Sequence, residues 1–415
     1  MDIAEMVYEF PPKIVGGLGT YAMEITQQFV KMGCNVTVFT MNDGKLPTRE
    51  LWRGVEVHRP ICTDISNILP TIIAEDVKKW GSGLKFFADV TAYNVLCSAK
   101  LVHEMVKKEE RKFDVVAAHD WLSIIGGASA KKELGIPLVF HVHSTEKGRT
   151  MGGGSAVVSS LEYQGGQIAD LVVTVSQAMR DELISLGFPE AKIRVCYNGV
   201  NEEKYNPDKV KPEEAQKIRE FYGIKENDLM ILFIGRLISV KGADRLIMAM
   251  PHVHRKIPNA KLVILGVGDM QSYLLNLVSA MKLENSVKFQ FQFIPEEERI
   301  RHYAACNLAV FPSLYEPFGI VNLEAMSMGK PVVVGASGIS GMKDQVVPSG
   351  PDQCGFHVNP HEPIDIAWGI ISILADPGAA LRYGENARRR VLQYFTWDVA
   401  AKNTLSIYES VLSKV

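Results

Sequence analysis

A chain of 415 residues is longer than one hydrophobic core usually serves, so two or three domains are expected. Hydrophobic residues make up 47% of the chain and charged residues 22%, which excludes a disordered or fibrous protein. The 45 basic and 47 acidic residues are mixed along the whole length without a basic stripe, which argues against a nucleic-acid partner.

The six cysteines lie far apart, with no C-x-x-C pair and no histidine at ligand spacing beside them. We therefore expect reduced, mostly buried thiols. No apolar run reaches the roughly 20 residues that span a bilayer, so no integral membrane association is expected. The N-terminus lacks a basic region followed by an apolar stretch, and a cytoplasmic protein is expected.

Short apolar runs alternate with amphipathic stretches of helical length through the first half of the chain. The expected strands, after a first one that precedes Pro12, are residues 36–40, 113–118, 137–142, 171–175 and 193–196. Such runs with helices between them are typical of parallel strands that are buried on both faces. The first half is therefore predicted to be a doubly wound α/β domain.

A charged, proline-bearing stretch at residues 201–228 interrupts the alternation and is interpreted as an interdomain connection. The alternation restarts with MILFIGRL and continues through KLVILGVG, SVKFQFQF, LAVFPS and PVVVGAS. Helices are expected at residues 242–253, 271–281, 367–374, 377–394 and 396–412. The pattern predicts two Rossmann-like domains, residues 1–205 and 206–395, with helix 396–415 packing back on the first. Open parallel sheets bind ligands at the carboxyl ends of their strands, so the two loop sets are expected to face each other across a cleft.

The first candidate site is the loop PKIVGGLGT at residues 12–20, between the first strand and a helix expected at 21–32. Glycines let the backbone approach a ligand, and a helix N-terminus offers unpaired N–H groups. Gly16, Gly17, Leu18 and Gly19 could therefore hold a phosphate or a sugar oxygen. Taken alone, the same pattern is equally typical of a tight turn without a ligand.

The second candidate is the segment that follows the strand expected at residues 230–234. Gly235 and Arg236 come directly after this strand, and Lys241 stands five residues beyond the arginine. The planar guanidinium of an arginine and the ammonium of a lysine can bind adjacent phosphates, so a pyrophosphate is the expected ligand. Solvated surface charges are the more frequent explanation of one such pair.

The third candidate is SLYEPFGIVNLEA, in which Glu316 and Glu324 are separated by seven residues. Two carboxylates at this spacing can accept hydrogen bonds from several hydroxyls, as holding a sugar and a ribose requires. The amides of Phe318, Gly319 and Ile320 stand at an expected helix N-terminus, where they suit a phosphate or sugar oxygen. An ordinary capped helix with an exposed glutamate is the alternative.

Together, GGLG, GRLxxxKG and EPFGIVNLE resemble the retaining family-four glycosyltransferases of the GT-B fold, close to glycogen and sucrose-phosphate synthases. The likeness runs over nearly the whole chain, and three ordered motifs are specific to that superfamily. Further runs fall where the family places similar ones: His119-Asp120-Trp121, Thr174-Val175-Ser176 and Asn198-Gly199-Val200. The first of these runs is a candidate acceptor contact, as is the segment 68–93.

The resemblance implies a site residue by residue. Arg236 and Lys241 would bind the donor diphosphate and stabilise the leaving nucleotide without a metal or another cofactor. Glu324 would accept from the ribose, while Glu316 and the amides of residues 318–320 would hold the transferred sugar. The groups implied to flank the donor base are Gly266, Gly268, Phe293, Ile294 and Pro295.

His143 matches the family's histidine at the end of a first-domain strand, where it contacts the transferred sugar. His141 is the rival assignment, but a strand releases its side chains toward a ligand only at its end. The family retains anomeric configuration through front-face substitution, in which the leaving phosphate oxygen deprotonates the acceptor, so Glu316 is not cast as a nucleophile.

One departure weakens the glycogen-synthase label. That group carries Lys-x-Gly-Gly-Leu, whereas Ile14 and Val15 separate Lys13 from Gly16 here. The resemblance favours transfer of glucose from a nucleoside diphosphate to a glucan, sugar or sugar phosphate. A non-catalytic nucleotide-sugar sensor and a GT-B epimerase or phosphorylase are the alternatives. The donor base, the acceptor and the oligomeric state stay open.

Overall fold

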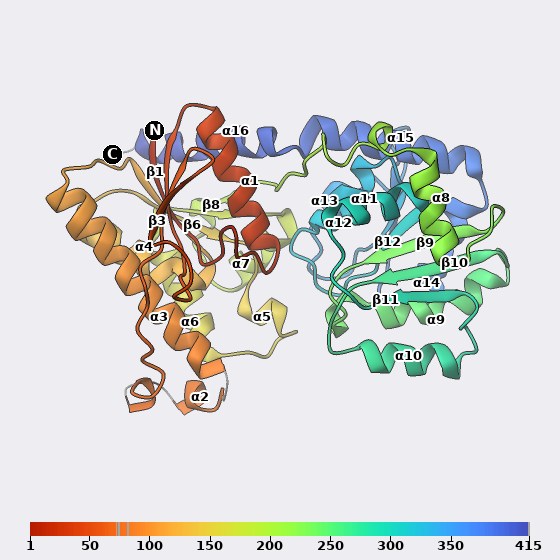
Figure 1. Ribbon diagram of the computed structural model, residues 1–415, viewed down its shortest axis with the longest axis horizontal. Coiled ribbons are helices and arrows are strands. Elements are labelled where there is room, and N and C mark those ends of the chain that lie inside the picture. The colour runs from red at the N-terminus through yellow and green to blue at the C-terminus, as the bar shows by residue number, and fades with distance from the viewer. Residues whose placement is uncertain (72, 74, 81–82, 414–415) are drawn as a thin grey trace. The chain divides into compact units, whose positions relative to one another are not determined.

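The computed structural model describes residues 1–71, 73, 75–80 and 83–413, which divide into two compact units (Figure 1). The first unit contains Met1–Tyr197 and Trp397–Val415, and the second contains Asn198–Thr396. Within the acceptor segment 68–93 expected from the sequence, Ile72, Ala74, Gly81 and Ser82 lie outside the described residues.

The first unit is built on an eight-stranded sheet in the order β3-β4-β2-β1-β5-β6-β7-β8. Its strands are β1 (Asp2–Met6), β2 (Asn35–Phe39), β3 (Arg49–Trp52), β4 (Val55–His58), β5 (Val115–His119), β6 (Leu138–Val142), β7 (Leu171–Thr174) and β8 (Ile193–Val195). Every pair is parallel except β3 with β4. The sequence pattern missed this edge hairpin because only one face of β3 is partly covered, so β3 is not an apolar run.

Helices cover both faces of this sheet. α1 (Gly17–Lys31) packs with α16 (Trp397–Leu412), while α4 (Asp120–Leu134) packs with α3 (Gly83–Ala99) and α6 (Ala156–Ile168) (Figure 1). The shorter helical segments are α2 (Glu75–Lys78), α5 (Glu146–Arg149), α7 (Gln177–Ser185), the π-helical Lys100–Lys108, and the 3-10 turns Leu69–Thr71 and Glu190–Lys192. The expected doubly wound domain is confirmed.

The second unit is built on a six-stranded, wholly parallel sheet in the order β11-β10-β9-β12-β13-β14. Its strands are β9 (Leu229–Ile234), β10 (Ala260–Leu265), β11 (Val287–Gln290), β12 (Leu308–Phe311), β13 (Val332–Gly335) and β14 (Gly355–Val358). The edge strand β14 was not predicted, because its four residues follow a polar turn and include a glycine and a histidine.

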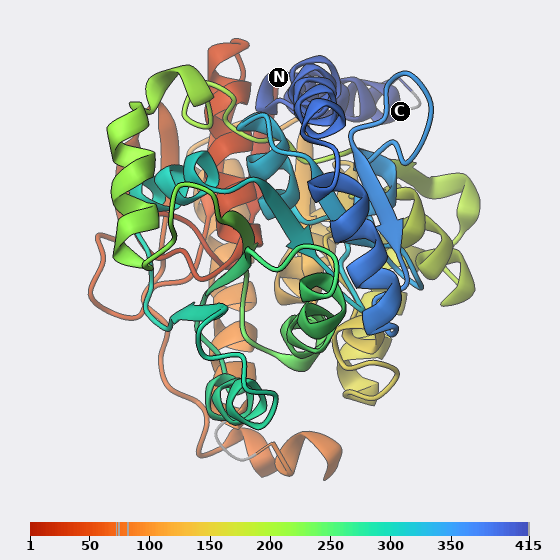
Figure 2. The ribbon, with the colours of Figure 1, turned by 90° about the vertical axis from the view of Figure 1, so that its right-hand side faces the viewer.

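On one face of this sheet α9 (Ala243–His254) packs against α14 (Pro363–Leu374), and on the other lie α11 (Glu296–Ala305) and α12 (Ile320–Ser327) (Figure 2). The remaining helical segments are α8 (Pro212–Phe221), α10 (Gln271–Ala280), α13 (Met342–Gln345), α15 (Pro377–Tyr394), and the 3-10 turns Pro207–Lys209 and Ser239–Lys241. Fully buried apolar side chains such as Ile231, Leu246 and Ile370 fill the space between sheet and helices. Each contributes about 1.5–3 kcal/mol by leaving water.

The stretch 201–228 is folded into the second unit. It contains α8, whose Glu214 accepts from the Nε of Arg301 on α11 at 3.0 Å, and the buried Tyr205. Charge and proline at its start, which suggested a connection, instead mark a helix N-terminus with Pro212 in the first turn.

Within the described ranges no single helix is long and apolar enough to cross a bilayer, and the one helix pair that passes together, α14 with α15, is bent by 98°.

Candidate active site

The loops after β9 and β12 bring a cation and a carboxylate together in the second unit. The Nζ of Lys241 forms an ion pair with Oε2 of Glu316, and both side chains are mostly buried, 17% and 11% exposed. The backbone N–H of Leu314 donates to the carbonyl of Val240 at 2.8 Å and so ties the two loops. Lys241 and Glu316, which the family resemblance implies at the donor, are therefore in direct contact. Burying two charges costs desolvation free energy, which the attraction between the lysine and the carboxylate must offset.

Arg236 belongs to the same strand-end loop but behaves differently. Its side chain is exposed, and in the part of the chain that the structure describes no acceptor is paired with its guanidinium. An exposed arginine near a paired lysine leaves one free cation for an incoming anion.

Close backbone approach explains the glycines of these loops. A Cβ on Gly242, whose φ is +71°, would lie 2.1 Å from the carbonyl oxygen of Pro312. At Gly266, where φ is +150°, it would lie 1.9 Å from the carbonyl oxygen of Gly235, and at Gly268 it would lie 2.2 Å from that of Leu237. The β10 loop thus packs directly on the β9 loop. The structure gives Gly266 and Gly268 a packing role, whatever they also contact in a ligand.

Helix α12 starts beside the Lys241–Glu316 pair. Its N-cap is Gly319 in the left-handed region at φ +91°, where a Cβ would lie 2.4 Å from Cε of Met342. Ile320 is the first helical residue, and Phe318 is buried. A helix N-terminus carries a partial positive charge, and this one lies beside Glu316, whose Cγ would be 3.2 Å from a Cβ on Gly319.

Glu324, on the same helix, lies in a separate buried network. Its carboxylate accepts from the hydroxyls of Tyr205 and Tyr303, each at 2.9 Å, and lies 3.2 Å from Nη2 of Arg299. Burial raises the pKa of Glu324, and the Arg299 charge opposes that rise. The family resemblance implied a ribose contact for Glu324, and no sequence pattern predicted these three partners.

Arg299→Met is expected to destabilise the second unit by about 1–3 kcal/mol, because it leaves a buried carboxylate without its cation. The folded-state pKa of Glu324, already above its ordinary value, should rise further. Folded Glu324 then binds its proton more tightly than unfolded Glu324, so the loss should grow from pH 5 to pH 8. Urea unfolding at both pH values measures it.

The matched control is Arg301→Met on the same helix, whose partner Glu214 is 32% exposed. An exposed pair contributes about 0–1 kcal/mol, so this variant should show a small and nearly pH-independent loss. A second substitution, Glu324→Gln, should remove the pH dependence from Arg299→Met. An equal loss at both pH values would contradict this account.

The glycine loop of the first unit already holds a carboxylate. Oε2 of Glu9 accepts from the backbone N–H groups of Val15 at 3.0 Å and Gly16 at 3.1 Å, just before α1 begins at Gly17. Gly16 and Gly17 are exposed, and a Cβ on either would meet nothing within 4 Å. Two backbone amides of this loop therefore bind an internal acid. Lys13 pairs with Asp43 at 3.2 Å.

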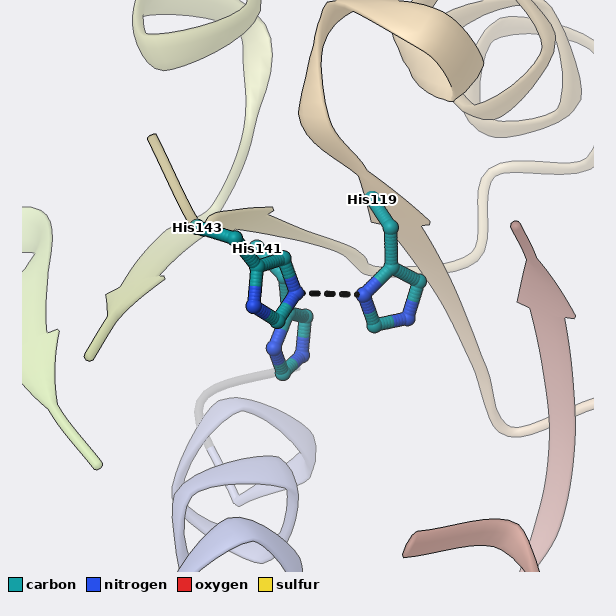
Figure 3. A group of neighbouring side chains, drawn as sticks. All are labelled: His119, His141 and His143. Atoms are coloured by element: carbon teal, nitrogen blue, oxygen red, sulfur yellow. Dashed lines mark hydrogen bonds between the residues drawn. The ribbon is translucent and has the colours of Figure 1, made fainter. Parts of the chain in front are cut away.

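Three histidines gather at the carboxyl ends of β5 and β6. Nδ1 of His119 lies 3.1 Å from Nε2 of His143, and His141 lies beside them (Figure 3). His141 is 1% exposed and its Nε2 lies 2.8 Å from the Tyr408 hydroxyl, whereas His143 is half-buried. Of the two rivals, His143 is thus the less buried residue.

The same three imidazoles each have a nitrogen within 4.8 Å of the others, close enough to consider a metal. Their ring planes, however, lie within 30° of one another. Nearly parallel rings direct their lone pairs side by side, whereas metal ligands converge on one point. The geometry fits a hydrogen-bonded stack better than a metal centre.

The candidate acceptor residues lie deep in the first unit. His119, Asp120 and Trp121 are 1%, 6% and 6% exposed. Asp120 accepts from the backbone N–H of His143 at 2.7 Å, and the Trp121 ring packs on Phe87. In this state these side chains support the histidine stack and the core.

The candidate base-flanking residues differ in exposure, since Phe293 is 85% exposed and Ile294 is 9% exposed.

The comparisons with known proteins decide the family. Residues 15–204 match the family described as Glycosyltransferase Family 4, and residues 214–390 match Glycosyl transferases group 1. An uncharacterized glycosyltransferase of Methanocaldococcus jannaschii is 34% identical over 99% of this chain and 98% of its own length. The chain belongs to the family-four glycosyltransferases.

This glycosyltransferase is also similar to a glycogen synthase of Mycobacterium tuberculosis, at 28% identity over 98% of the chain and 94% of the relative. Among solved structures, a sucrose-phosphate synthase of Thermosynechococcus elongatus matches with TM-score 0.77 and 24% identity over 100% of both chains. Anabaena HepE, in complex with UDP and glucose, matches with TM-score 0.72 and 24% identity over 99% and 100%. The expected GT-B fold is confirmed.

Proposed function

We propose that this glycosyltransferase moves a sugar, glucose in the first instance, from a nucleoside diphosphate to a glucan, sugar or sugar-phosphate acceptor with retention of configuration. The observation that carries the proposal is the pairing of Lys241 with Glu316 beside the N-terminus of α12, with Arg236 unpaired on the same loop. Two cations and a helix N-terminus form the charge pattern that a pyrophosphate needs.

In this proposal the cations and the carboxylate have separate tasks. Arg236 and Lys241 take the diphosphate and stabilise the charge that grows on it as the bond to the anomeric carbon breaks. Glu316, released from Lys241, accepts from hydroxyls of the transferred sugar, while Glu324 faces the ribose. His143 contacts the transferred sugar.

The chemical step is a front-face substitution. The acceptor oxygen forms a bond to the anomeric carbon on the side from which the diphosphate departs, and the acceptor proton passes to the leaving phosphate oxygen. In this scheme Arg236 and Lys241 of the second unit, rather than a metal, neutralise the charge on the leaving group. The HepE complex with UDP and glucose supports the choice of donor class.

Nucleotide release from a panel of UDP-, ADP- and GDP-sugars, with EDTA present, tests the function. Each donor is incubated with glycogen, glucose, fructose 6-phosphate or no acceptor. We expect one donor to release its nucleotide in an acceptor-dependent way. Release that is equal without acceptor would favour an epimerase or hydrolase, and tight donor binding without any release would favour a sensor.

A further inference from the structure

A line of buried polar side chains runs from His143 into the core of the first unit. His119 lies between His143 and Glu5, with its Nε2 2.6 Å from Oε2 of Glu5. The Tyr408 hydroxyl donates to Oε1 of Glu5 at 3.3 Å and lies 2.8 Å from Nε2 of His141. Glu5 and His119 are each 1% exposed, and Tyr408 is 0% exposed. We call Glu5, His119 and His143 the Glu5 chain.

Each contact in the Glu5 chain needs one donor and one acceptor, and with both imidazoles neutral only two arrangements satisfy them all. In the first, Glu5 is a carboxylic acid that donates to Nε2 of His119, and Nδ1–H of His119 donates to Nε2 of His143. In the second, Glu5 is a carboxylate and both hydrogen bonds run the other way. Tyr408 donates to Glu5 in either case.

The two arrangements leave His143 with different chemistry at its other nitrogen. In the first, a neutral His143 carries its proton on Nδ1 and offers a donor there. In the second, Nδ1 of neutral His143 is a bare acceptor. Among the described residues Nδ1 of His143 has no hydrogen-bond partner, so it is the nitrogen left for a ligand.

The surroundings of Glu5 favour the acid. Within the described residues, no lysine or arginine lies at ion-pair distance from its carboxyl, and its neighbours are imidazoles and a phenol. Burial raises the pKa of Glu5 to about 8, and burial also lowers the pKa values of His119 and His143. An uncompensated buried carboxylate is costly, whereas the all-neutral arrangement leaves no contact unsatisfied.

We propose that Glu5 and His119 are positioning residues that hold His143 as its Nδ1–H tautomer, so that His143 donates a hydrogen bond to an oxygen of the transferred sugar. The tautomer assignment follows from the Glu5 chain alone. Only the identity of the accepting oxygen rests on the proposed function.

Histidine nitrogen NMR tests the tautomer without any assay of activity. Protein labelled with nitrogen-15 at its ten histidines is compared with His143→Gln and His119→Gln, which assign the two rings. We expect His119 and His143 to carry their protons on Nδ1 and His141 on Nε2 near neutral pH. A proton on Nε2 of neutral His143 in the wild-type protein would overturn the proposal.

Two substitutions of Glu5 sharpen the test. Glu5→Gln presents an amide that donates to His119 and accepts from Tyr408, as the acid does, so His143 should keep its proton on Nδ1. Glu5→Met removes the donor and should shift His143 toward Nε2–H. The matched control is Glu162→Gln, another buried glutamate of the first unit that makes no contact with the Glu5 chain. Conversion of His143 to Nε2–H by Glu5→Gln would contradict the proposal even if Glu5→Met fails to fold.

Kinetics separate positioning from mere packing. Once a donor is known, Glu5→Met should lower kcat about tenfold or more with donor KM changed less than about twofold, while Glu5→Gln stays within about threefold of wild type. Equal kcat losses in the two variants would contradict a tautomer role. Failure to find any donor would refute the proposed function but would leave the NMR result to decide the tautomer.

Discussion

Lys241→Ala is expected to lower kcat by about 10²–10³-fold, the range seen when one group that stabilises a developing negative charge is removed. The lysine is mostly buried and contacts Glu316, so its ammonium is fixed before the donor arrives. Initial rates of nucleotide release at saturating donor measure the loss. The control is Lys217→Ala on the exposed side of α8, which should leave kcat unchanged.

A second comparison separates catalysis from folding. Lys241→Met alone leaves the carboxylate of Glu316 buried and unpaired, which should reduce stability, whereas Lys241→Met with Glu316→Gln should recover most of the stability. Both the single and the double variant should be inactive in nucleotide release. Normal turnover by the double variant would show that this pair only supports the loop and would remove it from the mechanism.

Gly242→Ala is expected to destabilise the second unit by about 3 kcal/mol or more and to abolish donor binding. The new Cβ would lie 2.1 Å from the carbonyl oxygen of Pro312, so the loop carrying Lys241 must move. Thermal unfolding and calorimetric titration with the donor found by the release assay measure the two effects.

Gly223→Ala is the matched control, because Gly223 has φ +66° but a Cβ there would meet nothing within 4 Å. Only the strain of an alanine in the left-handed region applies, about 1 kcal/mol. Similar losses in the two variants would mean that the Pro312 contact relaxes freely, and that Gly242 is not needed to seat Lys241.

The sequence predicted the parallel cores well because those strands are apolar on both faces. β6, β9 and β13 are such runs, and their residues are nearly all fully buried. The edge strands β3 and β14 were not predicted, because β3 is partly covered on one face only and the short β14 includes a glycine and a histidine. The segment 201–228 was interpreted as a connection because charged residues and proline, which interrupt the strand pattern, also occur in the first turn of a helix such as α8.

Of the candidate site, the residues within motifs were predictable and their partners were not. Lys241 and Glu316 stand in local patterns, and the structure places them in contact. Glu5 lies in an ordinary strand, and its link to Tyr408 spans 403 positions, so no local spacing signals it. In the sequence, nothing distinguishes Arg299 from the other charged residues expected on the surface of a helix. Tertiary packing brings these residues to their partners, so no sequence motif marks them.

The anomeric configuration of the product tests the central claim most directly. A donor with an α-linked sugar is converted in the presence of EDTA, and proton NMR follows the anomeric signal of the new glycosidic bond from the first turnovers. We expect an α-linked product that forms at the same rate with EDTA as without it. A β-linked product, or turnover that EDTA abolishes and a divalent cation restores, would contradict retaining transfer driven by Arg236 and Lys241.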